Sequence, residues 1–239
     1  MTFLQLCQAV RAQSGISGEG PSSVTNQLGV YADVVRWVAE AYNEIQTMYE
    51  NWNFLHNHYQ FTLQGGQSHY NPAQLVGSAG GVGVRTPTKD TFIVDKQSAV
   101  PVRNKRLDYI PWSVWQIDNR VLDGTIGRPT QYTEDPAGVY HFYPYEAPNS
   151  DAQLRIDHTI DFQGYARPHV MVENEDTPIL NPQYDELIVM KALIRYAEYY
   201  NSPEIMQSVT MRLNEQMKTL KYSELPRENL NTPPLVAFA

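Results

Sequence analysis

The chain of 239 residues contains a single cysteine, Cys7. One cysteine allows no disulfide within a chain, which is typical of a protein made in a reducing cytoplasm. Charged residues make up only 18% of the chain, and its formal net charge is −8. Because nucleic-acid phosphates are bound mainly by lysine and arginine, this balance argues against tight, non-specific DNA binding. It leaves open a surface that DNA slides past without adhering.

Long hydrophobic runs and enzyme motifs are also missing. No stretch of about 18 apolar residues occurs, so we expect no membrane span. The start Met-Thr-Phe-Leu-Gln has no basic region before an apolar run, so we expect no signal peptide. Neither Gly-x-Ser-x-Gly nor Gly-x-x-x-x-Gly-Lys is present, which argues against an esterase elbow and a P-loop. The sequence predicts no enzyme, no cofactor and no metal site.

Amphipathic helical patterns stand at both ends of the chain. Thr2 and Gln5 have the spacing of a capping box at the start of a first helix. Residues 185–222 carry two further patterns, with a new helix start at Ser202 and Pro203. A long helix is predicted near residues 30–51, because apolar residues recur there in steps of three and four. Its apolar face carries Tyr31, Val34, Val38, Tyr42, Ile45, Tyr49 and Trp52.

The middle of the chain reads as short strands and turns. A strand is predicted from His56 to Leu63, where polar and apolar residues alternate. A short helix is expected at Pro111–Asn119, packing Trp112 and Trp115. The glycine-rich residues 64–86 predict a long loop or a hairpin tip. Further strands are expected at 91–95, 99–102, 139–144 and 152–160.

These elements predict an α+β fold. An amphipathic helix buries its apolar stripe only against another element, so the helices of the two chain ends should pack together. We expect a helical bundle from residues 1–53 and 179–222 and an extended C-terminal tail at 223–239. Residues 54–178 should form an inserted β-rich domain, because short strands at this spacing are typical of a small sandwich or barrel-like sheet.

Several runs of the chain, taken together and in order, resemble the head-to-tail adaptor (connector) proteins of tailed bacteriophages. The runs are Glu50–Leu55, Gly127–Tyr132, Tyr140–Pro144, Leu154–His158 and Pro178–Ile188. The resemblance implies a structural virion protein of the neck, made in the host bacterial cytoplasm. It further implies a ring, a dodecamer, that lies beneath the portal protein and extends the DNA channel towards the tail protein below. The family has no catalytic motif to transfer.

The C-terminal arm is the first candidate site. Apolar residues spaced along a proline-rich stem suit a peptide that docks on a partner, because such a stem loses little entropy on binding. The resemblance implies that the partner is the portal, whereas the ordinary alternative is terminal disorder. The arm residues predicted to bind are Tyr222, Leu225, Pro226, Leu230, Pro233, Pro234, Leu235, Val236 and Phe238.

Acidic residues of the long helix are the second candidate site. Asp33, Glu40 and Glu44 lie on its polar face, as is ordinary for a surface helix. The sharper hypothesis is that they face the channel, where like charge would keep passing double-stranded DNA from adhering.

A histidine pair, an acidic run and a basic run complete the candidates. Two histidines on one strand face could share a metal, but a metal site needs three or four ligands. Paired carboxylates perform acid–base chemistry only at a defined separation in a cleft. The basic run could touch DNA or a neighbouring subunit. For all three we favour a solvated polar surface. The residues are His56 and His58; Glu173, Glu175 and Asp176; and Arg103, Lys105 and Arg106.

The favoured function is therefore a head-to-tail adaptor subunit with no chemistry of its own. A second hypothesis is another ring protein of the tail or baseplate, which would assemble without a portal. A third is a hydrolase acting on carbohydrate, since tyrosine and tryptophan stack on sugars, although no credible acid–base pair accompanies them.

Overall fold

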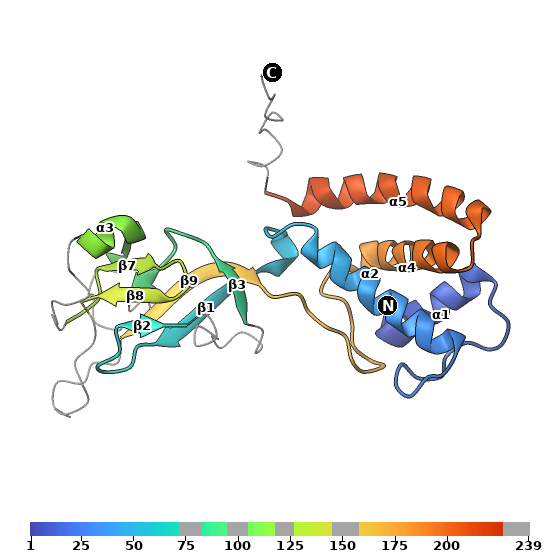
Figure 1. The fold of residues 1–239 in the computed structure, drawn as a ribbon, viewed down its shortest axis with the longest axis horizontal. Coiled ribbons are helices and arrows are strands. Elements are labelled where there is room, and N and C mark those ends of the chain that lie inside the picture. Colours follow the sequence, from blue (N-terminus) through green and yellow to red (C-terminus); the bar gives the residue numbers. More distant parts are fainter. Residues whose placement is uncertain (72–82, 95–104, 118–126, 145–157, 227–239) are drawn as a thin grey trace, which may run out of the picture. The chain divides into compact units, whose positions relative to one another are not determined.

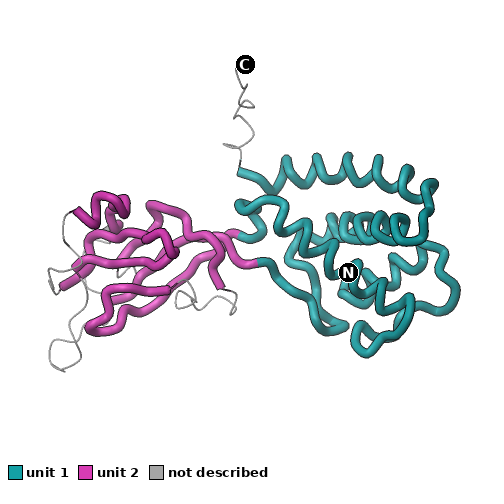
Figure 2. Tube along the Cα trace, viewed as in Figure 1, with its two compact units in different colours: residues 1–55, 168–239 teal, residues 56–167 magenta. Residues whose placement is uncertain are grey.

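The computed structural model describes residues 1–71, 83–94, 105–117, 127–144 and 158–226. The chain divides into two compact units, one of residues 1–55 and 168–239 and the other of residues 56–167 (Figure 2). The first unit is helical and the second is built on two sheets, so the predicted α+β class is confirmed. Residues 168–178, which the sequence grouped with the strands, belong to the helical unit.

The helical unit is arranged around α4, which contacts every other helix of the unit (Figure 1). Leu187, Val189 and Met190 are all fully buried, because neighbours cover more than one face of α4. The elements are α1 (Phe3–Ser14), α2 (Val30–Thr47), α4 (Asp185–Tyr199) and α5 (Pro203–Glu224), with 3-10 turns η1 (Asn53–Leu55) and η3 (Pro182–Tyr184).

Two helix starts can be compared with the sequence. The capping box of α1 is confirmed, since the Thr2 hydroxyl accepts the Gln5 N–H and the Gln5 side chain accepts the Thr2 N–H. At α5, Ser202 is the N-cap and Pro203 opens the helix, as predicted. The Ser202 side chain makes no capping hydrogen bond. Of the two residues that predicted this helix start, only Pro203 therefore favours it in the expected way.

The prediction that the long helix runs to residue 51 is wrong, because α2 ends at Thr47. In this last turn the Thr47 hydroxyl donates to the carbonyls of Asn43 (2.9 Å) and Glu44 (3.3 Å). Trp52 is nevertheless fully buried, and its indole N–H donates back to the carbonyl of Ile45 at 2.9 Å. The apolar stripe therefore continues in space after the helix has ended.

The buried amide of Gln46 secures the segment that returns from the inserted unit. It donates to the His169 carbonyl (2.9 Å) and accepts the His169 N–H (2.7 Å), which pairs both backbone groups of that residue. Tyr42, one turn earlier, accepts the Ile179 N–H at 3.0 Å. A buried backbone group without a partner costs free energy, so these two side chains fix the path of residues 169–179.

The inserted unit contains two sheets with one shared core. One sheet has the order β1-β9-β4-β5, with β3 also paired to β9, and the other has the order β2-β8-β7-β6. All described pairs are antiparallel except β6 with β7. The strands are β1 (His56–Thr62), β2 (His69–Tyr70), β3 (Val84–Pro87), β4 (Ile93–Val94), β5 (Lys105–Arg106), β6 (Asp108–Tyr109), β7 (Gln131–Glu134), β8 (Tyr140–Tyr143) and β9 (Thr159–Ala166).

Aromatic rings from both sheets fill that core. The Phe92 ring stacks on Tyr132 at 4.3 Å and on Phe162 at 4.8 Å, between centroids. Phe61 of β1 meets Phe142 of β8 at 5.8 Å. Aromatic pairs at these separations add stabilisation beyond the area they bury, so the two sheets are held by one continuous aromatic cluster.

The predictions of short helices and strands in this unit are confirmed in part. The helix expected at Pro111–Asn119 is confirmed as α3 (Trp112–Ile117), with Trp115 buried and Trp112 partly exposed. Strands form within the expected 91–95 and 139–144 segments. The last strand begins at Thr159 and runs to Ala166, beyond the expected 160. The expected strand 99–102, and the 72–82 part of the glycine-rich stretch, lie outside the described residues.

Gly164 of β9 is where a side chain would most directly disturb the sheet. A Cβ built there lies 3.0 Å from the Thr86 carbonyl oxygen and 3.1 Å from the Pro87 Cα, both backbone atoms of β3. We predict that Gly164→Ala lowers the free energy of unfolding by about 1 to 3 kcal/mol, the usual cost of overpacking. Urea unfolding followed by near-ultraviolet circular dichroism measures this.

Gly83→Ala is the matched control, because its Cβ would meet only the Arg167 side chain at 3.6 Å, an ordinary contact. Equal stability of the two variants would contradict the assigned tight crossing of β3 and β9.

Candidate functional site

The C-terminal arm starts from a fixed base on the helical unit. The Ser223 hydroxyl lies 2.8 Å from the Tyr184 hydroxyl, and the Lys221 ammonium lies 5.2 Å from the centre of the Tyr49 ring. Leu225 follows α5, is only 7% exposed, and donates its N–H to the Lys221 carbonyl at 3.1 Å. These contacts hold the point at which the arm leaves the helices.

The predicted arm residues divide into three groups. Tyr222 belongs to α5 and is 79% exposed. Leu225 is buried in the helical unit, so its side chain is not presented to a partner, and Pro226 is partly exposed. The other predicted arm residues lie outside the described part of the chain: Leu230, Pro233, Pro234, Leu235, Val236 and Phe238.

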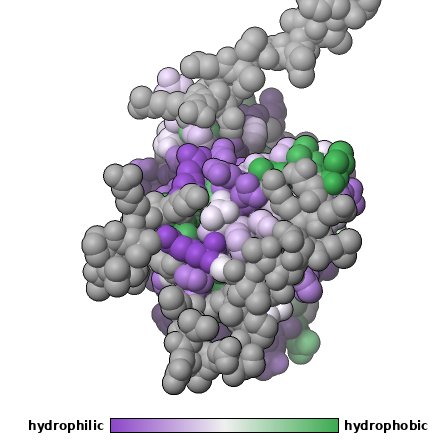
Figure 3. Space-filling view, turned by 90° about the vertical axis from the view of Figure 1, so that its left-hand side faces the viewer, coloured by the Kyte–Doolittle hydropathy of each residue, from purple (hydrophilic) through white to green (hydrophobic). Residues whose placement is uncertain are grey.

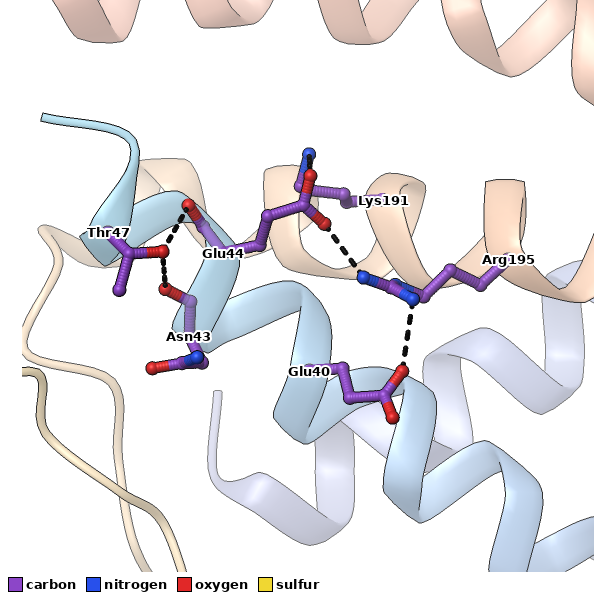
Figure 4. Close-up of polar contacts among 6 residues, drawn as sticks. All are labelled: Glu40, Asn43, Glu44, Thr47, Lys191 and Arg195. Atoms are coloured by element: carbon purple, nitrogen blue, oxygen red, sulfur yellow. Dashed lines mark hydrogen bonds and ion pairs between the residues drawn. The ribbon is translucent and has the colours of Figure 1, made fainter.

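All three acidic residues of α2 singled out from the sequence form ion pairs. Asp33 pairs with Arg36 on its own helix at 2.6 Å. Glu40 and Glu44 reach across to α4, where they share Arg195 at 3.0 and 2.9 Å (Figure 4).

Lys191 completes the cross-helix network. Its ammonium lies 2.8 Å from a Glu44 oxygen, so Glu44 has two cationic partners one helical turn apart on α4. Partial burial by itself would raise the pKa of Glu44. The hydrogen bonds and charges of Lys191 and Arg195 outweigh that effect and hold the pKa below its ordinary value of 4.5.

The network changes how the acidic face of α2 is interpreted. Glu40 and Glu44 bring two negative charges, and Lys191 and Arg195 bring two positive charges. The surface is therefore locally neutral. Reading along one helix could not reveal this, since the cations come from a helix far away in the sequence.

The histidine pair lies on an exposed face of β1. The His56 ring packs against Tyr165 at 5.4 Å between centroids, and His58 Nε2 lies 3.3 Å from the Gln163 side-chain nitrogen. Among the described residues, no group of three or more histidine, cysteine, aspartate or glutamate side chains is placed to hold a metal ion.

The acidic run forms a turn. The Asp176 carboxylate accepts the backbone N–H groups of Val172 (2.6 Å) and Glu173 (2.8 Å), and these bonds lower its pKa. Its backbone also joins the start of α1, since its carbonyl accepts the Phe3 N–H at 2.7 Å. This carboxylate is therefore used to shape the loop.

The basic run lies on β5 and beyond the described residues. Arg106 faces Asp90 at 3.4 Å, with both side chains well exposed, so the pair contributes little stability. Lys105 pairs through its backbone with Val94, and Arg103 lies outside the described residues.

Two exposed apolar features did not emerge from the sequence. At the end of α4, Trp37 of α2 meets Tyr199, whose side chain is 64% exposed. In the inserted unit, Val114 and Ile117 of α3 are 45% and 78% exposed. Figure 3 looks onto that unit, where a hydrophobic patch interrupts a largely hydrophilic described surface. In the helical unit, periodicity can group Tyr196 and Tyr200, which lie four residues apart on α4. It cannot show that Trp37, from another helix, contacts both of them.

No described helix combines the length and hydrophobicity needed to cross a membrane.

We predict that Glu44→Gln lowers stability at neutral pH by less than about 1 kcal/mol, because the Glu44 side chain is nearly half exposed and its charge is screened by solvent. A carboxylate with a depressed pKa stabilises the fold above its ordinary pKa, and this contribution is lost as the pH falls through the lower, folded value. The difference from the unchanged protein should thus be present at pH 7 and vanish in strong acid.

Urea unfolding at the two pH values measures this, with Glu215→Gln on the exposed surface of α5 as control. A pH-independent difference for Glu44→Gln would mean that the ion pairs with α4 do not contribute.

Comparison with protein families places these features in context. Residues 1–235 match the model of the family described as SU10 adaptor protein, so the match covers both units. The search among curated proteins finds no match. The family match confirms the resemblance to phage head-to-tail adaptors that the sequence suggested. The chain belongs to the SU10 adaptor protein family and is a structural adaptor protein of a phage.

Proposed function

We propose that this protein is a head-to-tail adaptor subunit that forms a ring beneath the portal. The ring extends the DNA channel and offers a docking surface to the tail protein below. Membership of the adaptor family supports the role. The observation that carries the portal contact is the anchored base at Ser223 and Leu225, from which an arm with apolar residues departs.

The mechanism is interface burial repeated by symmetry. Each arm offers the portal a short apolar peptide, whose own affinity is modest. Copies held together in a ring bind as one multivalent unit, so the combined affinity far exceeds that of a single arm. The fixed base favours this arrangement because it limits the volume that each arm must search.

We further propose that the α2 face carrying Asp33, Glu40 and Glu44 lines the channel. Paired charges give DNA neither a cationic patch to bind nor a strong repulsive field. The net charge of −8 acts in the same direction at longer range. DNA would thus pass without being held.

The alternative is a different ring protein of the tail or baseplate. The same family fold could support a ring there, but that ring would form without a portal. Binding to the portal from the same genome therefore separates the two functions.

We predict that truncation after Pro226 abolishes portal binding and leaves the helical unit folded. The cut follows the base, so Tyr184, Ser223 and Leu225 keep their contacts. A truncation before Ser223 would remove those contacts, so a loss of portal binding could then result from unfolding of the helical unit. The measurement is the solution mass of the protein mixed with portal rings, together with the far-ultraviolet spectrum of the truncated chain.

A full-length chain with Leu235→Ser, Val236→Ser and Phe238→Ser serves as the second variant. It should lose binding as well, since the apolar residues supply the affinity. Normal portal binding by both variants would overturn the assignment of the arm.

A further inference from the structure

The outer edge of β1 is the longest strand edge that lies open in the described part of the inserted unit. β1 has seven residues and pairs with β9 on one side, and no described strand pairs with its other side. The other strands that end the two sheet orders, β2, β5 and β6, have two residues each. An open edge of this length presents a row of backbone donors and acceptors to any extended chain.

The hydrogen-bond pattern shows which residues of β1 face the open edge. Directly after β1, the Leu63 N–H donates to the His158 carbonyl at 2.8 Å. Hydrogen-bonded pairs alternate along an antiparallel ladder, so the residues of β1 with odd numbers bond to β9. The residues with even numbers therefore direct their N–H and C=O groups away from β9: His56, His58, Gln60 and Thr62.

The backbone of β9 agrees with this assignment. Gln163 is the partner of His58 in the register, yet its carbonyl accepts the Thr88 N–H at 2.8 Å. The Gln163 N–H donates to the Thr91 hydroxyl at 3.0 Å. Thr88 follows β3 and Thr91 precedes β4, so both bonds lie on the side of β9 away from β1. The backbone groups of His58 therefore point to the open edge.

The sequence of β1 does not protect this edge against another strand. Exposed edges are usually blunted by charged residues, proline, bulges or very short strands. The seven residues His-Asn-His-Tyr-Gln-Phe-Thr include no lysine, arginine, aspartate, glutamate or proline, and their ladder with β9 has no register shift. By contrast, β3 ends at Pro87 and its register shifts after Val84. The edge of β1 thus suits the addition of a further strand.

This edge is complementary to the same edge of a second copy. Two β1 strands that run antiparallel about Tyr59 place His58 opposite Gln60 and His56 opposite Thr62 of the other copy. Four residues with one N–H and one C=O each supply eight outward groups, and this one register pairs all of them. The side chains brought opposite one another have no formal charge, so no like charges meet although each chain carries −8.

We propose that two copies of the free protein pair through β1, antiparallel about Tyr59, and join their β1-β9-β4-β5 sheets into one. The contact uses the same surface on both copies, so it closes at two copies and cannot propagate around a ring. A single strand pair is a small interface, so the dimer is weak and separates when its subunits enter a ring. The inference goes beyond the proposed function, because it assigns a contact of the free protein and needs no portal.

The test is disulfide cross-linking between full-length chains of two kinds. His58→Cys chains are mixed with Gln60→Cys chains, oxidised and analysed by mass spectrometry. Opposed residues that exchange hydrogen bonds have Cα atoms about 5.5 Å apart, within the range of a disulfide, so we expect dimers that join position 58 to position 60. The native Cys7 is fully buried and does not compete.

His58→Cys mixed with Thr62→Cys is the matched control. In the proposed register, position 62 lies opposite position 56, so a cysteine there is two residues away from its counterpart at 58. Such diagonal neighbours have Cβ atoms about 7 to 8 Å apart, too far for a disulfide. We therefore expect no cross-link from this mixture.

Sedimentation velocity measures the same contact without added cysteines. Gln60→Lys brings two lysines diagonally across the strand pair and should raise the dimer dissociation constant at least about tenfold. Gln163→Lys adds the same charge to β9, one strand further in, and should leave the dimer nearly unchanged.

Three outcomes would overturn the proposal. They are an unchanged protein that is monomeric at every concentration, equal effects of the two lysine substitutions, and a disulfide between positions 58 and 62. Because no portal is present, these outcomes are independent of the portal experiment.

Discussion

The pairing of β1 with β9 is the constraint on which the rest of the structure depends. The two strands are antiparallel over seven residue pairs, from His56 with Tyr165 to Thr62 with Thr159. The pairing brings the point where the chain leaves the helices next to the point where it returns. An insertion can join a host domain only if those ends are close. The C-terminal end of α2 binds the chain on both sides of the inserted unit. Before it, the Ile45 carbonyl accepts the Trp52 indole N–H; after it, the Gln46 amide bonds both backbone groups of His169.

Features encoded by neighbouring residues could be predicted from the sequence. The Thr2–Gln5 capping box, the helix around Trp115 and the α+β class all follow from local spacing. The partners of Glu44 could not be predicted, because Arg195 is 151 residues away and its rotation on α4 depends on packing. The end of α2 was missed because the apolar pattern continues after the helix has ended, with Trp52 still buried beyond Thr47.

The candidate site likewise combines features that the sequence predicts with features that only the fold shows. Sequence composition identified the arm by its prolines and apolar residues, but only the fold shows that Leu225 belongs to the helices and that the arm starts after it. Conversely, the sequence placed Glu40 and Glu44 on a polar face of α2, and only the fold shows that cations of α4 neutralise them. The described helical surface also exposes aromatic rings, Tyr199 and Tyr200, which the sequence did not single out as a site.

The insertion also sets the order in which the protein can fold during synthesis. The apolar face of α2, including Val34, Val38 and Ile45, is covered by α4, which leaves the ribosome about 150 residues later. At about 5 to 20 residues per second, that face stays open for roughly 8 to 30 seconds. The unit of residues 56–167 is contiguous and can form meanwhile. The inserted unit can thus fold before the helical unit is complete, and the apolar face of α2 is accessible to chaperones until α4 arrives.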